Sequence, residues 1–229
     1  MNPLLRRSAA HVFVSSLLTP TLNSDDQHHL ARVLRLRAGE SVSVSDGQGR
    51  WRICRFVSAD VLEPDTEIEL VERSAPEITI GFALPKGDRP EWIVQKLTEI
   101  GVDHVVVLHA ERSVVRWEPD RAERNIAKLV KVAREASMQS RRVWLPTVAG
   151  PLRADQLAGG SVSLAEPDGD TLTLAASTVL IGPEGGWTPA ELGLVASHVS
   201  LGNSILRVET AALVAAANLS ALRDHRATN

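Results

Sequence analysis

Residues 178–191 read TVLIGPEGGWTPAE. The first four are apolar or β-branched, which favours a buried strand, and Gly182 begins a glycine-rich turn. Thr188, Pro189 and Glu191 then form a helix-start signal, because the threonine and glutamate side chains can satisfy free backbone amides. The stretch predicts a strand, a tight turn and a capped helix, which is a building unit of a parallel α/β sheet.

Apolar runs alternate with helical patterns through residues 74–229, which we take as one α/β domain with a mainly parallel sheet. The expected strands are residues 78–84, 104–109, 161–166, 178–182 and 198–202. The expected helices are residues 90–100, 119–138, a short one near 152–158, 189–197 and 209–223.

Residues 1–73 consist mainly of short strand-like segments and predict a small β-rich domain. The tetrapeptide DGQG at 46–49 is a hairpin signal, because glycine adopts positive φ angles at little cost. The expected strands are residues 11–14, 41–45, 51–57 and 67–72. A helix is expected within residues 27–40, ending at Gly39, with one face made by His29, Leu30, Val33 and Leu34.

The composition is that of an ordinary soluble globular protein, with 44% hydrophobic and 23% charged residues. No apolar run has the roughly 20 residues that span a bilayer, and none resembles a signal peptide, so we expect a cytoplasmic protein without a membrane partner. Cys54 lies in an apolar stretch, and His28 and His29 have no acidic or cysteine partner at ligand spacing. The sequence therefore predicts a structural thiol and no metal site.

The net charge of −3 conceals two basic regions. Met1 to Ala59 contains eight arginines against four acidic residues, and the six acidic residues from Asp60 to Glu72 cancel that surplus only in the total. Residues 121–142 contain seven basic residues against two acidic ones. Two local basic surfaces on a mildly acidic protein favour selective docking to a nucleic acid.

The glycine-rich turn follows a parallel strand, where open α/β sheets bind ligands. It is not a phosphate-binding loop, since it lacks the lysine and the spacing of such loops and Glu184 would repel a polyphosphate. A neutral or cationic nucleoside fits better, and S-adenosylmethionine carries a positive sulfonium. Taken alone, the turn could equally be a structural one.

A second strand-to-helix junction lies at residues 201–212, LGNSILRVETAA. Its small residues would let a helix approach either a ligand loop or a partner subunit closely. Arg207 and Glu209 stand just before this helix. Without further context they could form no more than a surface ion pair.

Together, GPEGGWTPAE and LGNSILRVETA closely resemble the ribosomal small-subunit RNA methyltransferase E family of the SPOUT superfamily. Further stretches similar to the family occur in order, so the resemblance covers nearly the whole chain. They are HHLARVLRLRAGE, DGQGR, ALPKGDRPEWIVQKLTEIGV, ERSVVRW and REASMQSRRVWLP.

The resemblance implies a PUA-like RNA-binding β-barrel at residues 1–73 and a SPOUT methyltransferase domain with a deep trefoil knot at residues 74–229. It implies an S-adenosylmethionine-dependent enzyme that acts as a homodimer. It also implies the reaction, methylation of N3 of a uridine in the decoding region of 16S ribosomal RNA. The expected substrate is the 30S subunit or a late precursor of it, and the product is 3-methyluridine.

Carried over residue by residue, the cofactor loops of the family fall on residues 180–186 and 201–207. Both are irregular segments at strand ends that can offer backbone amides and carbonyls to an adenosine, with leucine and isoleucine side chains around its ring. The expected cofactor-binding residues are Leu180, Ile181, Gly182, Pro183, Glu184, Gly185, Gly186, Leu201, Gly202, Ser204, Ile205 and Leu206.

Uridine N3 is a poor nucleophile until it loses its proton, so an enzyme must stabilise the resulting anion and receive the proton. We assign the first task to Arg207 and the second to Glu209. Since N3 lies on the pairing edge, the base must be unpaired or flipped out. The arginines expected to hold the surrounding RNA are Arg7, Arg32, Arg35, Arg37, Arg134, Arg141 and Arg142.

The sequence leaves rival functions open. A methyltransferase of the same superfamily could act on transfer RNA or on another ribosomal site, and its product would distinguish it. An RNA-binding assembly factor that has lost catalysis would bind no cofactor, whereas the intact glycine loop favours binding. A nucleotide hydrolase is disfavoured by the missing phosphate-loop lysine and by the lack of paired carboxylates for magnesium.

Overall fold

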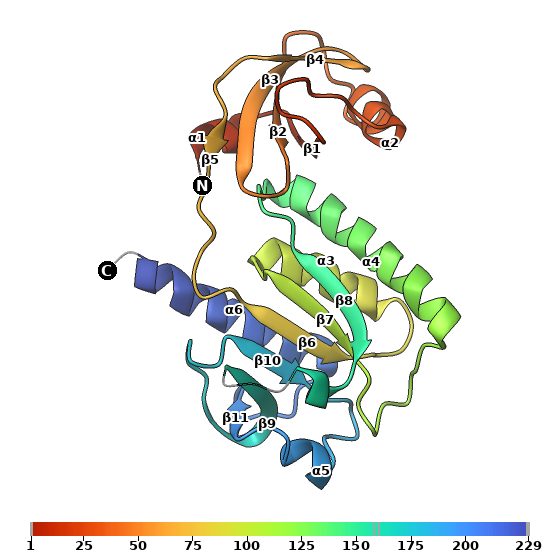
Figure 1. Ribbon diagram of the computed structural model, residues 1–229, viewed down its shortest axis with the longest axis vertical. Helices are drawn as coiled ribbons and strands as arrows, with labels where there is room; N and C mark the ends of the chain where they lie inside the picture. Colours follow the sequence, from red (N-terminus) through yellow and green to blue (C-terminus); the bar gives the residue numbers. More distant parts are fainter. Residues whose placement is uncertain (1, 158, 160, 228–229) are drawn as a thin grey trace. The chain divides into compact units, whose positions relative to one another are not determined.

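The computed structural model describes residues 2–157, 159 and 161–227, and Figure 1 shows their helices and strands. The chain divides into two compact units. One unit is Met1–Arg73 together with Ser137–Leu145, and the other is Ser74–Ala136 together with Pro146–Asn229. A short segment that is distant in sequence therefore belongs to the N-terminal unit.

The N-terminal unit is built on a five-stranded sheet. Its strands are β1 (Ala10–Phe13), β2 (Ser41–Ser45), β3 (Arg50–Ser58), β4 (Val61–Pro64) and β5 (Glu69–Leu70). β1 pairs parallel with β2, β2 and β3 form an antiparallel hairpin, and β4 and β5 both pair antiparallel with β3. Burial in this unit raises the pKa of the Cys54 thiol to about 11, in agreement with a structural thiol.

The hairpin turn follows from its sequence and is confirmed. The Asp46 carboxylate accepts hydrogen bonds from the backbone N–H groups of Gln48 (2.8 Å) and Arg50 (3.2 Å). Gly49 has a φ of +89°, and a Cβ there would lie 2.6 Å from the ring of Trp144. Both the backbone conformation and the lack of space require glycine at this position.

The helix expected within residues 27–40 is shorter than predicted. After the short α1 (Pro3–Arg7), the helical region consists of α2 (Ser24–His28) and one π-helical turn, η1 (His29–Val33). A π-helical turn changes the spacing of side chains, so the expected face does not form. Leu30 is buried, but its expected companions are exposed: His29, Val33 and Leu34.

The segment Ser137–Leu145 joins the N-terminal unit through specific contacts. Nε2 of His11 lies 2.9 Å from the carbonyl oxygen of Arg142. The Ser45 hydroxyl donates to the carbonyl oxygen of Val143 (2.9 Å), and the Val143 side chain is buried in a cluster with Trp51. These contacts are long-range in sequence, so no local pattern could predict them.

The C-terminal unit contains one six-stranded sheet. Its strands are β6 (Thr79–Ala83), β7 (His104–Leu108), β8 (Thr147–Leu152), β9 (Val162–Thr171), β10 (Thr178–Ile181) and β11 (Ser197–Ser200). The order is β11-β9-β10-β6-β7-β8, and every neighbouring pair is parallel, which confirms the expected parallel sheet. The knot stays a prediction.

Alternate residues of these strands face opposite layers. Ile80 and Phe82 of β6 lie in the core shared with helices α3 (Arg89–Ile100), α4 (Pro119–Ser140) and α6 (Val208–Ala227). On the other face, Leu180 packs with Trp187 beside the short α5 (Pro189–Leu192). The small residues of α6 are used inside this unit, since four of them are buried: Ala211, Ala212, Ala215 and Ala216.

Several expected boundaries in this unit were wrong. β8 was not expected, because Gly150 and Pro151 normally interrupt a strand pattern. The short helix expected near 152–158 is a single 3-10 turn, η2 (Ala154–Gln156), and residue 158 lies outside the described residues. α5 ends at Leu192, and β9 continues to Thr171. Within the described part of the chain, no helix has both the length and the apolar character of a membrane span.

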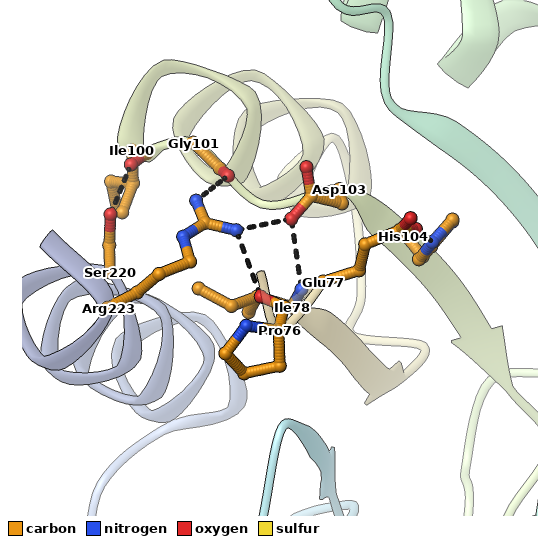
Figure 2. Close-up of polar contacts among 9 residues, drawn as sticks. All are labelled: Pro76, Glu77, Ile78, Ile100, Gly101, Asp103, His104, Ser220 and Arg223. Carbon is orange, nitrogen blue, oxygen red and sulfur yellow. Dashed lines mark hydrogen bonds and ion pairs between the residues drawn. The ribbon is translucent and has the colours of Figure 1, made fainter. Parts of the chain in front are cut away.

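A buried ion pair fixes the last helix at the amino ends of the strands (Figure 2). Nη1 of Arg223 lies 2.5 Å from Oδ2 of Asp103, and these side chains are 8% and 6% exposed. The same Oδ2 accepts a hydrogen bond from the backbone N–H of Ile78 (2.9 Å). Nη2 of Arg223 donates to the carbonyl oxygen of Gly101 (2.9 Å). α6 is thereby joined to the starts of β6 and β7.

Candidate functional site

The carboxyl ends of the parallel strands all lie on the same side of the C-terminal sheet, where α/β folds bind ligands. We call this side, formed by the strand ends, the carboxyl edge, and the opposite side the amino edge. The segments that leave the sheet there include residues 84–88 after β6, 109–118 after β7, 182–188 after β10 and 201–207 after β11. The two segments expected to hold a cofactor therefore extend from the same edge, with β9 between their strands.

The loop at 182–188 has a well-defined shape. Gly186 donates its backbone N–H to the carbonyl oxygen of Pro183 (2.8 Å) and has a φ of +69°. Trp187 is a packed core residue, and a Cβ at Gly182 would lie 2.9 Å from its ring. Among the expected cofactor residues, Leu180, Ile181 and Pro183 are buried, whereas Gly182, Glu184, Gly185 and Gly186 are half-buried or exposed.

Two side chains that the sequence analysis did not assign hold this loop against the loop after β7. Nη1 of Arg112 donates to the carbonyl oxygens of Gly185 and Trp187, each at 3.1 Å. The buried Glu191 carboxylate, in α5, accepts a hydrogen bond from the backbone N–H of Glu111 in the loop after β7 (2.9 Å). Arg112 lies in the family-like stretch ERSVVRW, but only the fold reveals its contacts.

The loop at 201–207 is held by fewer contacts. Gly202 has a φ of +136°, and no described atom lies within 4 Å of the place where its Cβ would stand. Leu201 and Leu206 pack against the core, while Ser204 is exposed. Ile205 is 84% exposed. Such an uncovered side chain offers an apolar surface that a ligand ring could bury.

Arg207 is exposed at the end of this loop, and Glu209 lies in the first turn of α6. Oε1 of Glu209 lies 3.6 Å from Nη1 of Arg89, at the start of α3. Within the described residues, the ion-pair partner of Glu209 is therefore Arg89, and no pair forms with Arg207. Oε2 of Glu209 is buried and has no hydrogen-bond partner in that part of the chain.

The arginines expected to bind RNA differ in exposure. Arg141 is half-buried, and its Nη2 donates to the carbonyl oxygen of Ser8 (2.7 Å). Desolvation lowers the pKa of this guanidinium. Arg134 and Arg142 are also half-buried, whereas the remaining four are exposed on the N-terminal unit: Arg7, Arg32, Arg35 and Arg37. Arg141 thus has a structural contact, and RNA binding stays a prediction for all seven.

Two family models match the chain. Residues 72–220 match an RNA methyltransferase domain, and residues 22–61 match an RNA methyltransferase PUA domain. The first match includes the parallel sheet and its carboxyl-edge loops, and the second includes β2 and β3. The fold and the site therefore define an RNA methyltransferase of the SPOUT class with a PUA-like N-terminal domain.

Known proteins narrow this class. The chain is 37% identical to the ribosomal RNA small subunit methyltransferase E of Synechocystis sp., over 89% of this chain and 73% of the relative. It is 30% identical to that of Bacillus subtilis, over 88% and 90%. The solved Neisseria gonorrhoeae enzyme of that name, bound to S-adenosyl methionine, superimposes with a TM-score of 0.79 at 25% identity, over 93% of this chain and 97% of that one. The chain belongs to the ribosomal RNA small subunit methyltransferase E family.

Proposed function

We propose that this protein, an S-adenosylmethionine-dependent methyltransferase of small-subunit ribosomal RNA, methylates N3 of a uridine in the decoding region of 16S ribosomal RNA. The product is 3-methyluridine, and the substrate is the 30S subunit or a late precursor of it. One observation carries the proposal: the RNA methyltransferase match over residues 72–220 contains both carboxyl-edge loops, 182–188 and 201–207.

S-adenosylmethionine supplies an electrophilic methyl group on a positively charged sulfur. The residues of the two loops fit such a molecule, since Gly186 and Gly202 leave open space where a side chain would stand. Ile205 offers an uncovered apolar surface, and the exposed Glu184 carboxylate attracts a cation. We assign binding to the main chain of residues 182–186 and to the second loop. The fully buried Leu180, in the strand that precedes residues 182–188, supports this loop.

We assign the chemistry at uridine N3 to Arg207 and Glu209. The exposed Arg207 guanidinium can stabilise negative charge on the carbonyl oxygens of the base as the N3 proton leaves. Oε2 of Glu209 accepts no hydrogen bond from any described residue, so it is available to receive that proton. The ion pair with Arg89 holds the Glu209 carboxylate in position.

RNA binding and homodimer formation belong to the same proposal. The exposed arginines of the N-terminal unit suit contacts with phosphates around an unpaired base, and we expect smaller contributions from Arg134, Arg141 and Arg142 because they are half-buried. The family resemblance supports a homodimer. The buried alanines of α6 are already covered within their own unit, so the dimer interface must use other surfaces.

The proposal is tested by transfer of a radiolabelled methyl group from S-adenosylmethionine to 30S subunits that lack the modification, followed by nucleoside analysis. We expect labelled 3-methyluridine, and fully modified 30S subunits, the matched control, should accept no label. Label in another nucleoside, or in transfer RNA alone, would assign the protein a different SPOUT activity. A protein that binds no cofactor would instead fit an RNA-binding assembly factor.

A further inference from the structure

A hollow of about 140 Å³ opens at the carboxyl edge of the C-terminal sheet. Its wall comes from the loop after β6, the start of α3, the loop after β7 and the middle of α4. The lining residues used below are Glu91, Val115, Trp117, Asn125 and Leu129. Neither family resemblance nor sequence pattern assigned a function to this place.

The volume limits what the hollow can hold. A cavity of about 150 Å³ accommodates one six-membered aromatic ring. Sites for larger ligands take roughly 300–1,000 Å³. The hollow is therefore too small for S-adenosylmethionine and fits a single pyrimidine ring.

The lining groups suit a nucleobase. Trp117 is half-buried and offers a ring for stacking, the usual way in which proteins hold an unpaired base. The Asn125 carboxamide has both donors and an acceptor for a pyrimidine edge, and no other described residue occupies them. Val115 and Leu129 add apolar surface. Glu91 is paired with Nζ of Lys128 (2.5 Å), which offsets its repulsion of RNA.

The hollow also lies next to the proposed chemistry. β6 and β10 are neighbouring parallel strands, so the loop after β6 leaves the sheet beside the glycine-rich loop. The loop after β7 supplies Trp117 to the hollow and Arg112 to the carbonyl oxygens of the glycine-rich loop. Arg89, which directly precedes the lining residue Pro90, pairs with Glu209. These contacts link the hollow to both the cofactor loop and the proton acceptor.

We propose that this hollow receives the flipped-out target pyrimidine, which stacks on Trp117 and forms hydrogen bonds with the Asn125 carboxamide. The identification of this base as the methylated one rests on the proposed function. Binding of a pyrimidine in the hollow does not require turnover, so the two can be tested separately.

The first test uses the full-length protein and a short single-stranded RNA with one 5-iodouridine, irradiated to crosslink that base to the ring on which it stacks. Mass spectrometry should locate the crosslink at Trp117, and Trp117→Leu, checked for folding by thermal melting, should lose it. Crosslinks at other residues only, or none, would overturn the pocket even if the protein makes 3-methyluridine. A Trp117 crosslink in a protein that makes no 3-methyluridine would support the pocket and overturn the function.

The second test is Asn125→Asp, which keeps the side-chain volume and removes the amide donors. We expect kcat/KM for 30S subunits to fall about tenfold or more, with unchanged affinity for S-adenosylmethionine. The control is Gln139→Glu, which adds the same negative charge at an exposed position of the same helix outside the hollow. Equal effects of the two variants, or no effect of Asn125→Asp, would contradict base recognition by Asn125.

Discussion

The amino and carboxyl ends of the strands in the C-terminal sheet differ in how far the side chains beside them are covered. At the amino edge, Arg223 and Asp103 are buried and pair with each other and with the backbone, while Nε of Arg223 has no hydrogen-bond partner among the described residues (Figure 2). At the carboxyl edge, Ile205 is uncovered, Gly202 stands beside open space and Oε2 of Glu209 has no partner among the described residues. Departures from complete packing are expected at functional sites, so we expect the amino edge to stabilise the fold and the carboxyl edge to bind ligands.

The largest effect is expected from breaking the amino edge with Arg223→Met. Removing one partner of a buried ion pair leaves the Asp103 charge uncompensated, so the free energy of unfolding should fall by about 3–5 kcal/mol. Denaturant unfolding measures it. Arg226→Met, at an exposed position of the same helix, should change it by no more than about 0.5 kcal/mol. A loss no larger than that of the control would mean that this edge does not stabilise the fold.

Arg207→Ala tests the role of the carboxyl edge in methyl transfer. The exposed side chain contributes little to stability, but loss of its charge should lower turnover about 100- to 1,000-fold. Affinity for S-adenosylmethionine and the melting temperature should stay unchanged. Single-turnover methyl transfer to 30S subunits measures the rate. Retained turnover would remove Arg207 from the mechanism.

Arg112→Ala tests whether the Arg112 side chain orders the loop at 182–188. Without the two hydrogen bonds to the carbonyl oxygens of Gly185 and Trp187, the glycine-rich loop is less ordered before binding. Hydrogen bonds of charged groups contribute about 1.5–3 kcal/mol, so affinity for S-adenosylmethionine should weaken about tenfold or more by calorimetry. Arg116→Ala is the control, since among the described residues Arg116 donates to the carbonyl oxygen of Glu111 within its own loop. Equal losses in both variants would contradict a specific brace.

The smallest effect is expected from Ile205→Ser. Because the side chain is 84% exposed, its loss should leave the stability of the free protein within about 0.5 kcal/mol. If a bound adenosine covers it, affinity for S-adenosylmethionine should fall about tenfold or less. Leu18→Ser, at a 74% exposed position of the N-terminal unit, should change neither quantity. Unchanged affinity in Ile205→Ser would exclude contact with the cofactor.

Local signals predicted the parts of the fold that depend on neighbours in sequence. The side chains of Thr188 and Glu191 form the expected capping box, and Asp46 directs the expected hairpin. The helix predicted within residues 27–40 was wrong, because the π-helical turn η1 changes the spacing of the side chains. Helix propensities do not predict such a turn. The packing of Ser137–Leu145 with the N-terminal unit depends on partners far along the chain.

The candidate site shows the same limit. The glycine-rich turn after a strand pointed to the first loop, and a strand end before an alanine-rich helix, together with the family resemblance, pointed to the second. The partners of those loops could not be predicted, since Arg89 and Glu209 are brought together only by the packing of α3 and α6. The hollow beside Trp117 likewise arises from separate segments that a linear pattern does not connect.

Hydrogen exchange of backbone amides, measured with and without saturating S-adenosylmethionine, tests most directly whether the carboxyl edge binds the methyl donor. We predict slower exchange in peptides that cover residues 182–188 and 201–207, and no change around Asp103 and Arg223. The larger slowing is expected at 201–207, because fewer contacts hold that loop in the free protein. Protection at the amino edge instead, or none at either loop while calorimetry records binding, would contradict the assignment.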